Sequence, residues 1–94
     1  MQGVGAVKYS VSVSPQFQKQ FKKLDVYTQK VIADWVNNNL VDCSNPRLHG
    51  KALKGNLAGK WRYRIGKYRL IALIQDDKLI ILMLNVGIRN EIYK

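Results

Sequence analysis

The sequence predicts a single α+β domain, in which two N-terminal helices pack on a mostly antiparallel sheet in the order β-α-α-β-β-β. Three observations support this fold class. Apolar residues alternate at the N-terminus, then recur at helical spacing, and alternate again from Lys60 onward. The 94 residues suit one domain spanning 1–94. Hydrophobic residues make up 47% of the chain, which is enough to form a core.

The first element expected is a strand over residues 7–13, with the sequence VKYSVSV. Its apolar side chains, at every second position, share one face, and lysine and serine share the other. This alternation predicts an edge strand with one face toward water. The apolar face consists of Val7, Tyr9, Val11 and Val13.

Two helices are expected next. Ser14 and Pro15 supply an N-cap and a proline at the first helical position. Apolar residues then recur at spacings of four and three, at Phe17, Phe21 and Leu24. Asp25 can cap the second helix, which the asparagine run at 37–39 is expected to fray. The apolar stripe of the second helix consists of Val31, Ile32, Trp35, Val36 and Leu40.

The second half of the chain predicts a loop followed by three strands. Residues 41–59 contain glycine, proline and basic residues without a sustained period, so we expect a loop with at most one helical turn. Strands are expected near 60–65, 68–75 and 78–86, with Asp76 and Asp77 as the turn between the last two. The last eight residues are expected to form a short tail.

The charge is strongly positive. Lys and Arg number 16 against 6 Asp and Glu, a formal net charge of +10. Such a surface attracts a nucleic acid, an acidic membrane or an acidic protein. Eight of the cations fall in a 23-residue stretch without an acid: Arg47, Lys51, Lys54, Lys60, Arg62, Arg64, Lys67 and Arg69. The charge is therefore concentrated in one part of the chain.

A hairpin turn at Gly66-Lys67 would fix the register of the first two of these strands. Arg64 then faces Arg69, and Arg62 faces Ile71. Alternation places the three arginines on one sheet face, opposite the face that carries Trp61, Tyr63, Ile65, Tyr68 and Leu70. Directly opposed like charges cost up to about 1 kcal/mol unless an anion lies between them. A phosphate-binding site is the favoured interpretation, and a solvated sheet face is the alternative.

The last strand and the tail are expected to add residues to the same face. A two-residue turn at Asp76-Asp77 would bring Leu84 near Arg69 and Leu82 near Ile71, which makes one end of the basic face apolar. In the tail, Arg89 and Tyr93 are four residues apart, so their side chains are expected on the same side.

These residue types suit the stabilisation of negative charge during RNA cleavage better than the proton transfers that cleavage also needs. Attack of a 2′-hydroxyl on the adjacent phosphate needs a base, stabilisation of the extra negative charge, and an acid for the 5′-oxygen. Arginine suits the second task because it binds phosphate oxygens bidentately. Arginine and tyrosine ordinarily titrate far above pH 7, so we expect a slow or assisted nuclease.

Other chemistries lack their residues. GKALKG at 50–55 has neither the spacing of a phosphate loop nor its Ser or Thr. The lone Cys43 and lone His49 cannot form an ordinary zinc site, so we expect no metal and no cofactor. A single cysteine also suits a reducing compartment, and no run of about 18 apolar residues is present. We therefore expect a soluble cytoplasmic protein that does not associate with a membrane.

Nearly the whole chain resembles the RelE/ParE superfamily of bacterial toxin-antitoxin toxins, in particular its RelE branch. The most specific segments are LKG at 53–55, WRYRIGKYRL at 61–70 and VGIRNEIY at 86–93. The resemblance implies an endoribonuclease that cuts messenger RNA in the ribosomal A site without a metal. It also implies an acidic RelB-like antitoxin that silences the toxin in a hetero-oligomer.

The resemblance assigns roles to residues at the matching positions. Arg62 and Arg64 match the two basic strand residues at the scissile region, one of which is a candidate for activating the 2′-hydroxyl. Arg69 matches the arginine that stabilises the phosphorane, Arg89 the one that helps to protonate the leaving oxygen, and Tyr93 the tyrosine that stacks on the nucleotide. Further RNA contacts are expected from Arg47, Lys51, Lys54 and Lys60, of which Lys54 matches a basic loop residue of the family.

Two other functions stay open at this point. The same fold could serve a ParE-like inhibitor of DNA gyrase, which does not need the arginine and tyrosine set as a cluster. A non-catalytic RNA-binding module would need only the phosphate contacts.

Overall fold

The computed structural model describes residues 7–88, which form a five-stranded sheet with two helices on one face. The strands are β1 (Ser10–Val13), β2 (Lys51–Ala52), β3 (Trp61–Ile65), β4 (Tyr68–Gln75) and β5 (Ile80–Ile88). The helices are α1 (Pro15–Lys22) and α2 (Val26–Asn39), and Gly55–Leu57 form a 3₁₀ turn, η1. The sheet order is β1-β5-β4-β3-β2, in which only β1 is parallel to its neighbour. The α+β fold class is confirmed.

Both helices begin where the capping residues predict. The Ser14 side chain accepts a hydrogen bond from the Phe17 N–H at 3.0 Å, and the Asp25 carboxylate accepts one from the Thr28 N–H at 3.1 Å. The expected fraying of α2 is wrong, because the helix continues to Asn39. The Asn39 side chain donates to the Trp35 carbonyl at 2.8 Å, and this bond supports the last turn.

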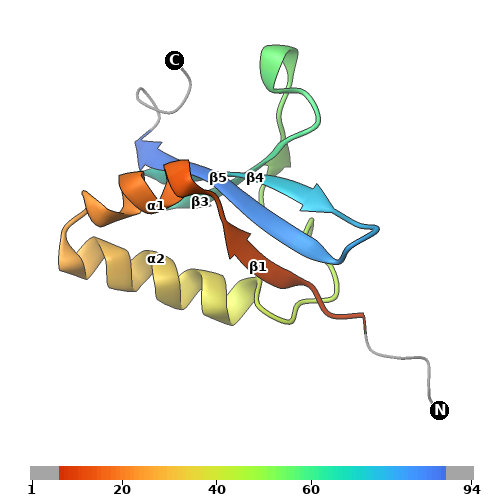
Figure 1. The fold of residues 1–94 in the computed structure, drawn as a ribbon, viewed down its shortest axis with the longest axis horizontal. Coiled ribbons are helices and arrows are strands. Elements are labelled where there is room, and N and C mark those ends of the chain that lie inside the picture. The colour runs from red at the N-terminus through yellow and green to blue at the C-terminus, as the bar shows by residue number, and fades with distance from the viewer. Residues whose placement is uncertain (1–6, 89–94) are drawn as a thin grey trace.

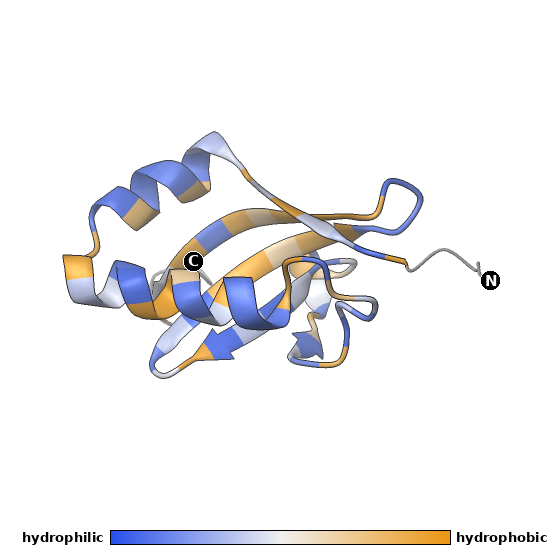
Figure 2. Ribbon diagram, turned by 90° about the horizontal axis from the view of Figure 1, so that it is seen from below, coloured by the Kyte–Doolittle hydropathy of each residue, from blue (hydrophilic) through white to orange (hydrophobic). Residues whose placement is uncertain are grey.

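The core lies between the helices and the sheet. Its largest fully buried side chains include Tyr63 and Leu70 of the sheet and Ile32 of α2. In Figure 2 the long strands are the most hydrophobic part of the ribbon, whereas the helices are mostly hydrophilic. The face that carries Tyr63 and Leu70 is thus the buried one, as the alternation predicted, and the face that carries the arginines is turned away from the helices.

The segment expected to be a loop contributes an additional strand. Lys51 and Ala52 pair with Arg62 and Trp61, so β2 extends the sheet beyond β3. Gly50 allows this approach, because a Cβ at that position would lie 2.2 Å from the Arg62 carbonyl oxygen. The chain between β2 and β3 projects from the body of the molecule (Figure 1). The single helical turn expected in this segment is η1.

The register between β4 and β5 differs from the expected one. Arg69 pairs with Gly87, and Ile71 with Asn85, instead of Leu84 and Leu82. One cause is the turn, which spans the four residues 76–79 and so shifts the pairing by two. The other is a bulge, because Ala72 pairs with Met83 and leaves Leu84 without a partner. Gly87 and Ile88, expected in the tail, belong to β5.

From the bulge onward, β5 is bordered by helix α1 and its N-cap residue and no longer by β1. β1 ends at Val13, which pairs with Met83. Beyond it, the Ser14 hydroxyl donates to the Leu84 carbonyl at 3.1 Å, and the Val86 N–H donates to the Gln20 side chain at 2.8 Å. The polar side chains of α1 therefore replace a neighbouring strand along this part of β5.

Candidate functional site

The two hairpin strands bring three arginines together as predicted. Arg64 pairs with Arg69, and Arg62 pairs with Ile71, so the three side chains lie on one face of the sheet. β2 adds Lys51 to this face, because Lys51 pairs with Arg62. We call the surface formed by Lys51, Arg62, Arg64 and Arg69 the basic face. The sequence could not assign Lys51 to this face, because residues 41–59 were expected to form a loop and not a strand.

No acidic side chain neutralises the basic face within residues 7–88. The two ion pairs of this part of the chain are Lys30–Asp34 on α2 and Arg47–Asp76 at the β4–β5 turn. The arginine hydrogen bonds are long, at 3.5 Å from Arg64 Nε to the Gly66 carbonyl and 3.4 Å from an Arg69 terminal nitrogen to the Lys67 carbonyl. The guanidinium groups are therefore available to an anion.

Two nitrogen atoms of the basic face are buried without a hydrogen-bond partner among residues 7–88. They are the Nε atoms of Arg62 and Arg69. A buried donor without a partner costs free energy, which an acceptor brought by a ligand would recover. The corrected register places Gly87, which is buried, opposite Arg69 on β5. Phosphate oxygens have the charge and the acceptor geometry that this arrangement fits.

The apolar end expected for the basic face is present, but its β4 residues pair with other residues of β5 than expected. Ile71, which follows Arg69 on this face, is 1% exposed although it lies outside the main core. Leu73 continues the same face and pairs with Leu82. The side chains of Ile71, Leu73 and Leu82 form an apolar surface next to the guanidinium groups. The low dielectric constant of such a surface strengthens the attraction between arginine and phosphate.

The other sequence candidates are distributed over two regions. Lys54 is exposed at the N-terminal end of η1, in the projecting segment. Lys60 lies at the end of that segment, where its carbonyl accepts a hydrogen bond from the Leu53 N–H at 3.0 Å. Arg47 lies apart from the basic face, with its guanidinium 6.0 Å from the ring of Trp61, a residue of the opposite sheet face. Arg89 and Tyr93 lie outside the described residues.

Arg47 belongs to a structural cluster that the sequence did not indicate. Its two terminal nitrogens donate to the Asp76 carboxylate at 3.0 and 2.9 Å, and the Tyr9 hydroxyl donates to the same carboxylate at 2.6 Å. The bonds from Arg47 and from Tyr9 lower the pKa of Asp76 to about 2. The cluster ties the residue that precedes β1 and the 44–50 loop to the β4–β5 turn.

Cys43 and His49 take structural positions. Burial raises the pKa of the Cys43 thiol, which disfavours the reactive thiolate. The His49 ring packs edge-on against Trp35 at 5.6 Å between centroids. Within residues 7–88, no three side chains of the metal-binding types gather, and no helix is long and apolar enough to cross a membrane.

The comparison with protein families identifies the chain. A model described as the ParE toxin of the type II toxin-antitoxin system, parDE, matches residues 11–93. The chain belongs to this family. It is therefore a toxin of the RelE/ParE superfamily, as the sequence motifs predicted. No curated protein matches the sequence.

Solved structures of RelE toxins and their complexes share the fold of this toxin. A chain of the toxin-antitoxin complex RelBE2 from Mycobacterium tuberculosis matches with a TM-score of 0.80 and 26% identity, over 93% of this toxin and 98% of that chain. The isolated RelE toxin of E. coli matches with a TM-score of 0.69 and 21% identity, over 90% of both chains. The RelE-RelB complex of Pyrococcus horikoshii matches with a TM-score of 0.64 and 20% identity, over 89% and 98%.

Proposed function

We propose that this toxin is a metal-independent endoribonuclease that cleaves messenger RNA in the ribosomal A site. The observation that carries the proposal is the basic face, on which Arg62, Arg64 and Arg69 meet without an acidic partner among the described residues. A surface whose buried guanidinium nitrogens have no partner in the described part of the chain is suited to hold a phosphate whose charge increases during the reaction.

The chemistry follows from the positions of the arginines. A phosphate between the cross-strand pair Arg64 and Arg69 would remove the repulsion of these like charges and receive bidentate hydrogen bonds. Arg69 would stabilise the phosphorane formed when the 2′-hydroxyl attacks, and one of Arg62 and Arg64 would help to activate that hydroxyl. Family resemblance assigns protonation of the 5′-oxygen to Arg89 and stacking on the nucleotide to Tyr93.

The proposal includes two kinds of partner. The ribosome would present the messenger and supply the geometry that arginine alone does not provide. A chain with a net charge of +10 also fits an acidic RelB-like antitoxin, which would bind the toxin in a hetero-oligomer and prevent cleavage. Growth arrest on expression of the toxin alone, relieved by co-expression of the antitoxin, is the expected phenotype.

The decisive experiment combines purified ribosomes and a programmed messenger with the toxin and maps the cleavage sites. Arg69→Ala is expected to slow cleavage by about 10²- to 10³-fold, because one donor to the developing charge is lost. Lys22→Ala is the matched control, since this exposed cation lies on α1, away from the basic face. Full activity of Arg69→Ala would exclude the mechanism.

Inhibition of DNA gyrase is the second candidate, because the family model that matches the chain is described as the ParE toxin of the parDE system. A gyrase supercoiling assay run beside the cleavage assay separates the two functions. Inhibition of supercoiling without cleavage of the messenger would establish the gyrase function. Salt-dependent RNA binding without either activity would indicate a binding module.

A further inference from the structure

A pocket of about 200 Å³ lies near the β2 edge of the sheet, on the opposite side from the basic face. Ala52 of β2 pairs with Trp61 of β3. Alternation turns both of these side chains to the face opposite to that of Lys51 and Arg62. The pocket, which we call the Trp61 pocket, is lined by Arg47, Ala52, Gly59, Lys60, Trp61 and Ile74.

Two flat side chains of the Trp61 pocket are held in place by hydrogen bonds. The Trp61 indole N–H donates to the His49 carbonyl at 2.7 Å. The Arg47 guanidinium lies 6.0 Å from the centre of the Trp61 ring, and its bidentate bonds to Asp76 fix its plane. Unpaired nucleobases stack on aromatic rings and on guanidinium planes, so the pocket presents two surfaces suited to a base.

The remaining lining residues leave room for such a ring. Ala52 and Gly59 are small and exposed, and Trp61 is only partly buried. A Cβ at Gly59 would meet nothing within 4 Å, so the space beside this residue is open. Ile74 adds an apolar surface from β4. A planar, mostly apolar group can therefore reach the indole.

Lys60 supplies a cation at the same pocket. The two ion pairs within residues 7–88 are Lys30–Asp34 and Arg47–Asp76. The charge of Arg47 is therefore matched by Asp76, whereas the Lys60 ammonium has no acidic partner in this part of the chain. An aromatic surface beside an unmatched cation fits a ligand that combines a flat ring with a negative charge, as a nucleotide does.

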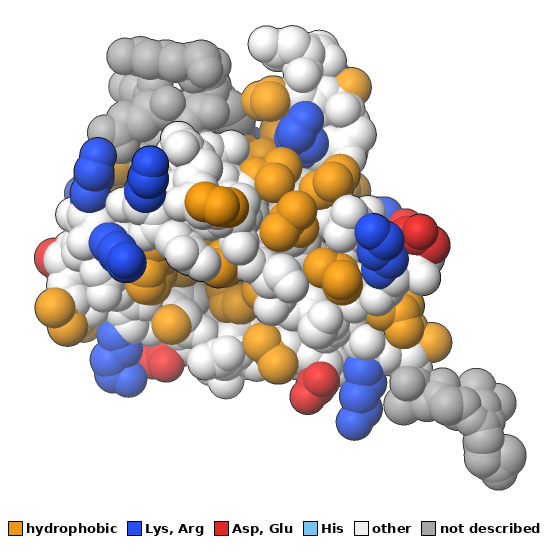
Figure 3. Space-filling view, viewed as in Figure 1, with side chains coloured by type: hydrophobic (Ala, Val, Ile, Leu, Met, Phe, Trp, Pro, Cys, Tyr) orange, Lys and Arg blue, Asp and Glu red, His pale blue; other side chains and the backbone are white. Residues whose placement is uncertain are grey.

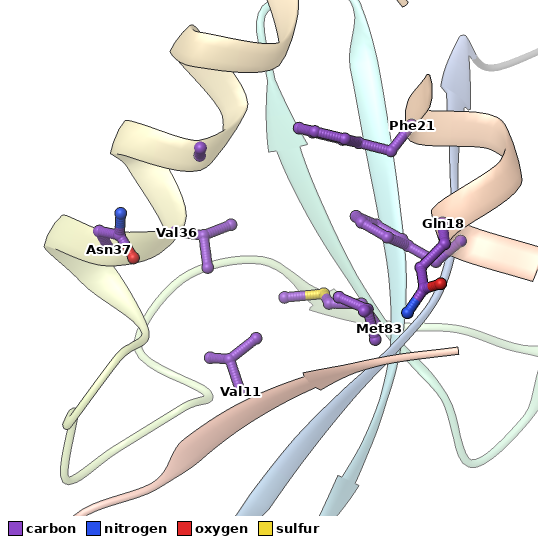
Figure 4. A pocket seen from close by; sticks show the side chains of 9 residues that line it. Val11, Gln18, Phe21, Val36, Asn37 and Met83 are labelled. Carbon is purple, nitrogen blue, oxygen red and sulfur yellow. The ribbon is translucent and has the colours of Figure 1, made fainter. Parts of the chain in front are cut away.

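The apolar groove between β1 and the two helices has a different chemistry. Its volume is about 290 Å³, and its lining contains no charged residue. Figure 4 shows Phe21 reaching in from α1, Val36 from α2 and Val11 from β1, around Met83. In Figure 3 hydrophobic side chains lie near the middle of the visible face, and lysine and arginine side chains lie toward its margins. A phosphate would meet no cation inside this groove, so the Trp61 pocket is the better site for a nucleotide.

The β2 edge connects the Trp61 pocket to the basic face. β2 has only two residues, and within residues 7–88 no strand lies beyond it. Lys51 belongs to the basic face, and its neighbour Ala52 lines the pocket. An RNA strand whose phosphates contact Lys51 and Arg62 can therefore cross this edge and place a neighbouring nucleotide in the pocket.

We propose that the Trp61 pocket binds one unpaired nucleotide of a single-stranded RNA, with the base stacked on Trp61 and the phosphate bound by Lys60. The inference rests on the proposed function for the identity of this RNA as the messenger, and it adds a second contact outside the basic face. The nucleotide in the pocket is not the one that is cut. It anchors the strand whose scissile phosphate the arginines hold.

Photochemical cross-linking of the unaltered toxin tests the stacking contact. The probes are single-stranded oligonucleotides that carry 5-bromouridine at successive positions and 2′-O-methyl groups, which prevent attack by the 2′-oxygen. Irradiation is expected to join one position of the probe to Trp61, as mapped by mass spectrometry. Trp35, which packs against Tyr63 and His49, is the internal reference and should remain unmodified. A saturated complex without an adduct at Trp61 would overturn the proposal.

The affinity of the same oligonucleotide for two variants tests the pocket by a second route. Trp61→Leu removes the stacking surface, and Ala52→Ile narrows the pocket while Trp61 stays in place. Each is expected to bind at least about fivefold more weakly, which corresponds to the loss of one stacked base. Ala33→Ile is the matched control, because it adds the same side chain at an exposed position of α2 outside the pocket. Circular dichroism checks the folding of each variant.

The salt dependence of binding separates stacking from charge. Ala52→Ile removes no cation, so the slope of log K against log salt should remain that of the parent. Lys60→Gln should make this slope less steep by about 0.7, because one phosphate contact is lost. An unchanged slope for Lys60→Gln would overturn the phosphate contact. Parent affinity of Ala52→Ile would show that Trp61 acts only through the fold and would overturn the stacking contact.

The outcomes also distinguish this inference from the proposed nuclease. An adduct at Trp61 and weaker binding by Ala52→Ile would support the pocket even if the toxin cleaved no messenger on the ribosome. Conversely, parent RNA affinity of Ala52→Ile together with loss of cleavage in Arg69→Ala would overturn the pocket and leave the nuclease mechanism in place.

Discussion

Tyr63 connects the core to the loop that precedes β2. Its side chain is fully buried, and its hydroxyl donates to the Pro46 carbonyl at 2.6 Å. Burial raises the pKa of the Tyr63 hydroxyl, so the group remains a donor at neutral pH. Its ring also contacts Trp35 of α2, with the centroids 5.6 Å apart. One residue therefore fixes the strand, the helix and the loop beside the basic face.

Tyr63→Phe should lower the free energy of unfolding by about 1 to 2 kcal/mol, because the buried Pro46 carbonyl would lose its donor. Urea unfolding followed by fluorescence measures the change. Tyr27→Phe is the control, since Tyr27 is 75% exposed, and it should leave the midpoint unchanged. Equal midpoints for Tyr63→Phe and the parent would show that the hydrogen bond does not stabilise the fold.

The lowered pKa of Asp76 predicts that the stability of the folded state decreases at acidic pH. A carboxylate whose folded pKa is below its ordinary value of about 3.9 stabilises the folded state above that value. Its contribution is lost as the pH falls toward the folded pKa, which is about 2 for Asp76. Asp76→Asn should therefore lower the urea midpoint at pH 7 and reduce the loss of stability between about pH 4 and pH 2.

Asp77→Asn provides the matched control for this measurement. Asp77 lies in the same turn and is exposed, and its side chain makes no hydrogen bond with the described residues. The control should retain the parent midpoint at pH 7. If Asp76→Asn and Asp77→Asn gave the same pH profile, the cluster of Asp76 with Arg47 and Tyr9 would not account for the acid dependence.

At the scale of elements, β2 decides how far the basic face extends. The strand has only two residues, and it places Lys51 beside Arg62. It can lie there because Gly50 has no side chain to meet the Arg62 carbonyl or the Trp61 indole, which would lie 2.2 and 2.7 Å from a Cβ. The indole N–H donates to the His49 carbonyl at 2.7 Å, which further fixes the start of β2.

Gly50→Ala should detach β2 and destabilise the protein by at least about 1 kcal/mol more than Gly59→Ala. Both glycines have a positive φ, 87° and 91°, but a Cβ at Gly59 would meet nothing within 4 Å. The comparison therefore separates the clash from the backbone strain. Urea unfolding and amide exchange at Lys51 measure the effect, and equal destabilisation by the two substitutions would contradict it.

At the scale of the whole molecule, the basic face and the apolar groove lined by Val11, Phe21 and Val36 lie in different places. The basic face lies on the side of the sheet away from the helices, whereas the apolar groove lies between β1 and the helices. The two surfaces are therefore separate on a domain whose Cα radius of gyration is 13.6 Å.

The separation predicts how RNA binding responds to salt. If all four cations of the basic face contact phosphates, log K should fall with log salt with a slope of about −3 for single-stranded RNA. Arg62→Gln should make this slope less steep by about 0.7. Lys22→Gln, on α1, should leave it unchanged. Fluorescence anisotropy at several salt concentrations measures both slopes, and equal shifts for the two variants would show that binding follows only net charge.

The sequence by itself determined the fold class, the helix starts and the β3–β4 register, because alternation, caps and a Gly-Lys turn are local signals. It thereby placed Arg62, Arg64 and Arg69 together. The bulge at Leu84, the parallel pairing of β1, the strand β2 and the Asp76 cluster appeared only in the tertiary structure. Each depends on contacts between segments distant in sequence, where one inserted residue shifts every later pairing and no local pattern records the partner.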